Sequence, residues 1–427
     1  MAHSDISVSL SNKEVLKKND PLSFLYKGFV FLFLLSTLFD PADKLFNLKV
    51  PLFLGCWIFG GLILLIDKSA IKIPINLLMY VFLMIIIPLI SIAYYLAIDG
   101  SDPFEGFLLL KSYLFFSFAL LLFATRVDVL KYLSIGLALL AFSVLALSVF
   151  ILFFPEVYWE VYHFGERYGI YHIDKTRDYG GGMKFFQMYF VTSSMLVIAI
   201  AYYFDKWRSL KIKKRRWPYF ILVIMIVCAM FVAGTRNNMI FSVLLLMGLI
   251  FLYSRQKLLV GVSLTVIVGV FAILWSDQIL ALFDPNEPSN YTKLLFLGDY
   301  SRFLSDYQTL FFGQGLGAYE YWTGRGYNFV TELTYFEVIR YFGILMGGVI
   351  LFLMLYPVIY AFVLRGSYNQ KSIVFAYATY LLMSATNPLF FSSMGMLILA
   401  IVISNIFIFE SNIRRYLSSM DNMNSHL

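Results

Sequence analysis

Residues 232–246, VAGTRNNMIFSVLLL, hold the end of one apolar run and the start of the next, with a short gap around Arg236 between them. The gap is so short that Arg236 must lie close to the medium in which both runs are embedded. Composition identifies that medium, because 60% of the residues are hydrophobic, 14% are charged and the mean hydropathy is +0.77. Apolar runs near the roughly 20 residues needed to cross a hydrocarbon core recur along the chain. The sequence therefore predicts a single all-α polytopic membrane domain over residues 1–427.

The lengths and hydropathy of these runs predict about twelve transmembrane helices. Their expected ranges are 24–39, 49–66, 73–98, 106–124, 129–153, 186–204, 219–233, 239–253, 258–275, 335–364, 372–386 and 389–409. The polar stretch before Phe24 carries basic residues and no small-residue cleavage site, so we expect the first helix to be retained as an anchor.

The segment 205–218, DKWRSLKIKKRRWP, predicts the orientation of the chain. Basic flanks of transmembrane helices stay in the cytoplasm. With this loop inside and twelve helices, both termini are cytoplasmic. The net charge of +7 is then a positive-inside signature, and nucleic-acid binding is a poor second interpretation. Cys56 and Cys228 lie within expected helices and indicate no disulfide framework.

Two expected outer loops stand out by their length. They cover residues 154–185 and 276–334, and loops this long in a compact protein are usually functional or disordered. The segment 300–312, YSRFLSDYQTLFF, predicts an amphipathic helix on the membrane surface. Its apolar face would hold Phe303, Tyr307, Leu310 and Phe311. The second loop would lie between helices nine and ten.

Several basic residues fall on the outer side, where the positive-inside rule does not place them. Lys44, Lys49, Lys175 and Lys293 are interpreted as solvated loop charges. In contrast, Arg236, Arg302 and Arg340 are flanked by apolar sequence at the membrane boundary, where an ionised group is costly unless paired.

Arg236 falls at an expected helix start. Thr235 is a plausible N-cap, so the first-turn N–H groups and the guanidinium would face an anion together. The planar fork of arginine suits a phosphate. The alternative is that Arg236 only snorkels to lipid headgroups.

Three segments in the third of the chain from Val232 to Leu351 carry a resemblance. They are AGTRNN at 233–238, SRFLSDYQTLFFGQGLGAY at 301–319 and TELTYFEVIRYFGILMGGVIL at 331–351. In order and spacing they resemble the O-antigen polymerase and ligase superfamily of bacterial surface glycan assembly. The resemblance implies a fold similar to glycosyltransferases of the C-type architecture, in the bacterial inner membrane, with the active site facing the periplasm. It also implies that the large outer loop 276–334 caps this site.

The resemblance also implies a reaction. Such proteins transfer glycan from a polyprenyl pyrophosphate to an acceptor hydroxyl, and no cofactor is implied. Expected partners are undecaprenyl-pyrophosphate-linked glycan, membrane lipids and a chain-length regulator protein. The chain contains no D-x-D pair and no His/Cys cluster with metal-ligand spacing, so we expect a metal-independent glycosyltransferase whose cations come from the protein.

The expected catalytic residues are Glu332, Arg236 and Arg302. Glu332 lies where relatives carry His or Glu and is the candidate base; the alternative is a loop carboxylate paired with Arg325 or Arg302. Glu337 ends TYFE, which has the form of a capping box, and Arg340 lies three residues further on the same face. Expected substrate-binding residues are Arg325, Arg340, Arg177, Glu337 and Tyr335.

Departures from the family pattern leave other functions open. GGGMKFFQ at 180–187 differs from the corresponding element of relatives, which puts Arg177 in doubt. Glu332 replaces the ligase-type histidine, which favours a polymerase over a ligase. His163 and His172 are assigned surface or packing roles. A flippase or transporter of lipid-linked oligosaccharide is the alternative of another class, although no matching halves are visible.

Overall fold

The computed structural model describes residues 20–66, 73–98, 103–178, 184–210, 212–274, 276, 280, 284–364 and 371–424. The elements in chain order are α1 (Pro21–Phe39), α2 (Lys49–Ile66), α3 (Ile75–Ile98), α4 (Phe104–Phe115), α5 (Phe118–Thr125), α6 (Val129–Phe153), α7 (Tyr158–Tyr168), β1 (Tyr171–Asp178), β2 (Lys184–Phe190), α8 (Leu196–Ser209), α9 (Lys213–Val232), α10 (Arg236–Tyr253), α11 (Lys257–Leu274), α13 (Pro288–Leu304), α14 (Tyr307–Phe312), β3 (Glu320–Trp322), β4 (Gly326–Asn328), α15 (Thr334–Ile359), α16 (Lys371–Ser384) and α17 (Ser393–Asn424).

The chain is an all-α polytopic membrane protein in which the described residues also form two small antiparallel strand pairs, β1–β2 and β3–β4. Within the described residues, nine helical segments are long and apolar enough to cross a membrane. They are α1, α2, α3, α4 with α5, α6, α9, α10, α15 and α17. The helices α8 and α16 have 14 residues each, and the apolar part of α11 covers only Lys257–Val270. The number of twelve spans therefore stays a prediction.

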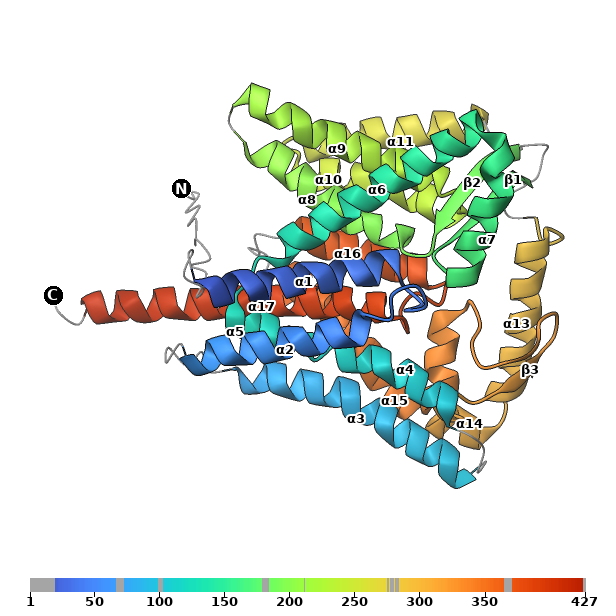
Figure 1. Ribbon diagram of the computed structural model, residues 1–427, viewed down its shortest axis with the longest axis horizontal. Coiled ribbons are helices and arrows are strands. Elements are labelled where there is room, and N and C mark those ends of the chain that lie inside the picture. Colours follow the sequence, from blue (N-terminus) through green and yellow to red (C-terminus); the bar gives the residue numbers. More distant parts are fainter. Residues whose placement is uncertain are drawn as a thin grey trace.

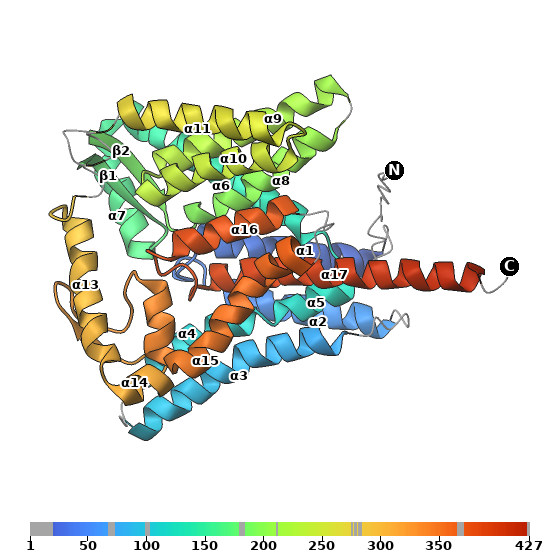
Figure 2. The same cartoon turned by 180° about the vertical axis from the view of Figure 1, so that it is seen from behind.

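The helices form a bundle with two different ends (Figures 1 and 2). One end holds the start of α1, the C-terminal end of α17 and the turn between α8 and α9, where the basic segment lies. The opposite end holds α7, the β1–β2 hairpin, α13 and α14. Both views show α13 lying across the axes of the spanning helices. This end therefore carries the segments that were expected to form the two long outer loops.

Helix starts follow the local sequence. Thr235 is the N-cap of α10, and its Oγ1 accepts a hydrogen bond from the backbone N–H of Asn238 at 3.1 Å. Glu287 caps α13 in the same way through Asn290 N–H at 2.9 Å, with Pro288 at the first helical position. Such side-chain oxygens satisfy N–H groups that the helix leaves without partners. The predicted start of α10 is thereby confirmed.

The predicted span 106–124 matches the candidate span Phe104–Thr125, although a short turn separates α4 from α5 within it. Two other predicted spans were wrong in detail. The span 186–204 begins as strand β2, and helix starts only at Leu196, after a short 3-10 turn. The span 389–409 starts at Ser393 and continues to Asn424. An apolar run of strand length cannot be distinguished from a buried helix by hydropathy alone, which explains the error at 186–204.

The single amphipathic helix expected over 300–312 was also wrong. Helix α13 ends at Leu304 with Ser305 as its C-cap, and Asp306 is the N-cap of α14, because its carboxylate accepts from Thr309 N–H at 2.9 Å. The break places Phe303 in the buried core and leaves Tyr307 exposed, so the two do not share one face. The element is instead packed on the protein through a small second core of Phe296, Tyr300, Phe303, Trp322 and Leu333.

A kink in α15 fixes the outer segment to the bundle. Gly343 has φ +65°, and a Cβ there would overlap the carbonyl group of Phe311 at the end of α14. The kink leaves two α15 carbonyls available, and they accept hydrogen bonds from Gln314 N–H (2.7 Å, to Arg340 O) and Gly315 N–H (3.1 Å, to Tyr341 O). Only glycine adopts this conformation without strain.

Candidate functional site

A strip of charged and polar side chains lies along one side of α13. Arg236, in the first turn of α10, contacts Glu287 (Nη2 to Oε1, 2.8 Å) and donates to Asn290 Oδ1 at 3.1 Å. One turn further along α13, Lys293 Nζ lies 3.7 Å from Glu332 Oε2. Helical residues three apart are neighbours on the helix surface, so these contacts follow one another in space.

The strip continues to the β3–β4 turn. Arg325 Nη2 donates to Glu332 Oε1 at 3.1 Å. We call Arg236, Glu287, Asn290, Lys293, Arg325 and Glu332 the polar row. Its charged side chains are between 16% and 38% exposed. They are therefore partly shielded from solvent but still accessible to a ligand. Three cations face two carboxylates, so the row carries one excess positive charge.

Tyr189 approaches the polar row from β2. Burial is the main cause that raises the pKa of its hydroxyl to about 12. A hydrogen bond with Ser194 lowers this pKa, and the negative charge of the nearby Glu332 raises it further. The first outer segment thus carries a phenol close enough to Glu332 for the charge of Glu332 to raise its pKa.

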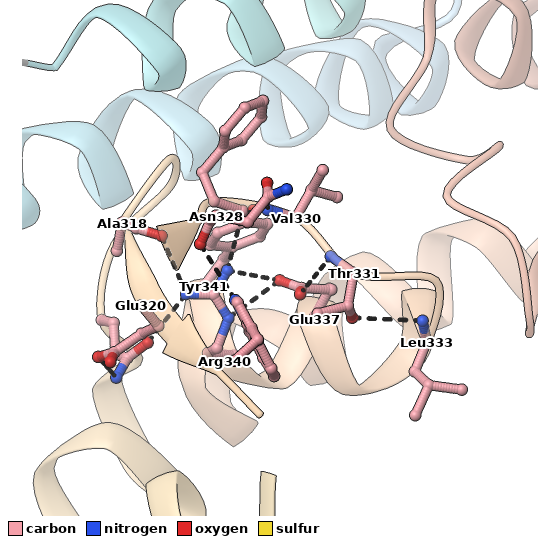
Figure 3. Close-up of polar contacts among 12 residues, drawn as sticks. Ala318, Glu320, Asn328, Val330, Thr331, Leu333, Glu337, Arg340 and Tyr341 are labelled. Carbon is pink, nitrogen blue, oxygen red and sulfur yellow. Dashed lines mark hydrogen bonds and ion pairs between the residues drawn. The ribbon is translucent and has the colours of Figure 1, made fainter. Parts of the chain in front are cut away.

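A closed ionic network surrounds Arg340 (Figure 3). Glu337 and Arg340 pair at 2.7 Å with both side chains at 0% exposure. All five guanidinium N–H groups have acceptors: Nε and Nη2 donate to Glu337 Oε2, Nη2 also to Phe329 O, and Nη1 to Gln314 Oε1 and Ala318 O. Arg340 therefore has no N–H left for a substrate.

The other oxygen of Glu337 is also occupied. Its Oε1 accepts from Tyr300 OH at 2.7 Å and from Thr331 N–H at 2.9 Å. Burial, and then the charge of Glu337, raise the pKa of Tyr300. The capping-box interpretation of TYFE was wrong in one respect, because Leu333 is the N-cap and Thr334 Oγ1 donates to Asn387 O instead.

The remaining expected site residues lie elsewhere. Arg302 is exposed and contacts Asp299 at 3.5 Å and Tyr321 O at 3.3 Å. Tyr335 OH donates to Leu381 O at 2.6 Å and packs α15 on α16. Arg177 lies in β1, and its side chain is outside the part that the structure describes.

The structure thus brings together Arg236, Arg325 and Glu332, and it separates them from Arg302, Tyr335 and the Glu337–Arg340 pair. Sequence reasoning missed three members of the polar row: Glu287, Asn290 and Lys293. One signal was present, because an arginine at the membrane boundary requires a counter-charge and Glu287 starts a helix in the facing loop.

Comparison with protein-family models, with curated protein sequences and with solved structures gives no match. Within the described residues, no group of three or more His, Cys, Asp or Glu side chains is placed to hold a metal ion. The function of the chain is therefore inferred from its own residues.

Proposed function

We propose that the protein is a polymerase of lipid-linked oligosaccharide repeat units in the bacterial inner membrane. It would transfer glycan from undecaprenyl pyrophosphate to a sugar hydroxyl on the outer face. The observation that carries this proposal is the polar row, in which Lys293 and Arg325 contact the carboxylate Glu332 and Arg236 contacts Glu287 at the start of α13. In Figure 1 these elements lie at the bundle end away from the basic segment. The resemblance of residues 233–238, 301–319 and 331–351 supports the same function.

The polar row suits the charge changes of glycosyl transfer. The acceptor oxygen forms a bond to the anomeric carbon, the bond from that carbon to the pyrophosphate oxygen breaks, and its electron pair leaves on undecaprenyl pyrophosphate. Three cations stabilise that leaving group. In the free protein Lys293 and Arg325 are paired with Glu332. When the pyrophosphate takes these cations, Glu332 becomes free to accept the hydroxyl proton.

The buried network has a positioning role in this proposal. Arg340 donates to carbonyls on both sides of the β3–β4 hairpin, at Ala318 and Phe329, and this hairpin carries Arg325 in its turn. Glu337 holds the backbone of Thr331, the residue before Glu332. The pair thus fixes two members of the polar row without contacting the substrate itself.

The test is reconstitution. Purified protein in proteoliposomes, supplied with undecaprenyl-pyrophosphate-linked repeat units as the only substrate, should yield a ladder of polymer lengths on electrophoresis. Absence of polymer from folded protein contradicts the proposal. Deletion of the gene separates the alternatives: single-repeat surface glycan indicates a polymerase, polymer retained on its carrier indicates a ligase, and repeat units retained on the inner leaflet indicate a flippase.

A further inference from the structure

The β3–β4 hairpin presents two tyrosine rings to solvent. Tyr321 and Tyr327 are directly opposed in the strand register, and their ring centroids lie 5.4 Å apart at an interplanar angle of 70°. Tyr321 is 51% and Tyr327 78% exposed. Side chains alternate between the faces of a strand, and the neighbouring Trp322 is fully buried in the second core. The two tyrosines therefore form an outward face with no protein partner among the described residues.

The hairpin that carries them is held rigidly. Gly324 and Gly326 have φ of +92° and +75° in its turn, and Trp322 Nε1 donates to Asn328 O at 3.0 Å across the strands. Arg340 donates hydrogen bonds to the backbone carbonyls of Ala318, before β3, and Phe329, after β4. A rigid aromatic pair loses little conformational entropy on binding a ligand.

A cation lies beside the tyrosines. Arg302 Nη2 donates to Tyr321 O at 3.3 Å, and the side chain is 59% exposed. Rings, phenol hydroxyls and guanidinium N–H groups together match a sugar residue, which has a face of C–H groups and a rim of hydroxyls. The C–H face packs on an aromatic ring, and the rim accepts or donates hydrogen bonds.

The alternatives fit less well. Two tyrosines are far too small for a stable protein interface, which takes about 800 Å² on each partner. A membrane-inserting loop needs an apolar face, whereas the turn between the tyrosines is Thr323, Gly324, Arg325 and Gly326. The position of the hairpin favours a glycan ligand. Arg325 in the hairpin turn contacts Glu332, so the two tyrosines and the polar row are parts of one connected surface. Figure 1 places β3 beside α13 at the end of the bundle that carries the polar row.

We infer that Tyr321, Tyr327 and Arg302 form an oligosaccharide-binding subsite outside the reaction centre, which holds the glycan chain while its end occupies the polar row. This inference rests on the proposed function and names where the glycan part of that substrate is held. Arg302 then has a role in binding glycan, away from the pyrophosphate.

Binding tests the subsite directly. The probe is a set of short oligosaccharides released by mild acid from the surface polysaccharide of the source cell, and saturation-transfer NMR with the full chain in nanodiscs gives the Kd. Y321A/Y327A should raise Kd about tenfold, as expected for the loss of two aromatic contacts. Y321F/Y327F should raise Kd by less than the alanine variant, because the rings remain and only the phenol hydroxyls are lost. The matched control is Tyr307→Ala, which removes a ring that is also 78% exposed but lies on α14.

Polymer length separates failure of the subsite from failure of the proposed function. In proteoliposomes, Y321A/Y327A should make shorter chains than wild type and Tyr307→Ala, because the growing glycan dissociates sooner. Wild-type protein that forms no polymer refutes the proposed function. Polymer of unchanged length together with an unchanged Kd in Y321A/Y327A refutes the subsite alone, and so does an equal loss of binding in Tyr307→Ala.

Discussion

Glu337 and Arg340 form an ion pair one helical turn apart on α15, at 2.7 Å and with no exposure of either side chain. Breaking a buried pair by neutralising one partner leaves a buried charge, which costs about 3–5 kcal/mol. We therefore predict that Glu337→Gln lowers the thermal unfolding temperature markedly in detergent. Trp322 lies 5.3 Å from the Arg340 guanidinium, so Trp fluorescence is a suitable probe.

The control for this prediction is Glu332→Gln. The Glu332 carboxylate is partly exposed, and ion pairs of that kind contribute about 0–1 kcal/mol. Its unfolding temperature should stay near that of wild type. Equal stability of the two variants contradicts the positioning role assigned to the buried pair.

The Glu337–Arg340 pair and the Thr235 cap could both be predicted because they depend on residues three apart. Helical spacing places such residues on one surface, and a side chain at an N-cap reaches the N–H groups of the next turn. All-α membrane architecture was predictable for a similar reason, since hydropathy over about 20 residues is a local property.

The partners of Arg236 were not predictable. Asn290 lies 54 residues further along the chain, and its position depends on how α13 crosses the end of the bundle. Lys293 looked like an ordinary loop charge for the same reason. The β1–β2 hairpin was not predictable from hydropathy either. The sequence of β2, KFFQMYF, is mostly apolar like that of a membrane helix, and its strand conformation depends on pairing with β1.

Arg236 is predicted to act on the leaving group. Arg236→Ala should lower the polymerisation rate by about 10²- to 10³-fold, which is the usual loss when one transition-state donor is removed. Arg236→Lys should restore only part of the rate, because the ammonium keeps the charge but lacks the planar fork. The measurement is the initial rate in proteoliposomes containing equal amounts of folded protein.

The ion pair with Glu287 supplies the control for Arg236. Glu287→Gln keeps an oxygen to cap α13 but removes the charge that faces Arg236. If Arg236 acts on the substrate, Glu287→Gln should retain most of the activity. An equal loss in both variants assigns Arg236 to anchoring α13 on α10.

Activity is predicted to need no divalent metal. The chain has no D-x-D pair, and three side-chain cations are available in the polar row. Turnover in proteoliposomes should continue at its full rate in excess EDTA. A loss that Mg²⁺ or Mn²⁺ restores contradicts this prediction and requires a metal at the pyrophosphate.

Glu332 is predicted to accept the proton of the attacking hydroxyl. Glu332→Gln keeps the size of the side chain and its hydrogen bond with Arg325, but an amide takes up no proton at neutral pH. The variant should fold, bind lipid-linked substrate and lose about 10²- to 10⁴-fold in rate, as for removal of a general base. Glu332→Asp should recover part of that rate, since it restores a carboxylate at a shorter reach. Near-normal turnover of Glu332→Gln contradicts this prediction and leaves Glu332 only the role of an ion-pair partner for Lys293 and Arg325.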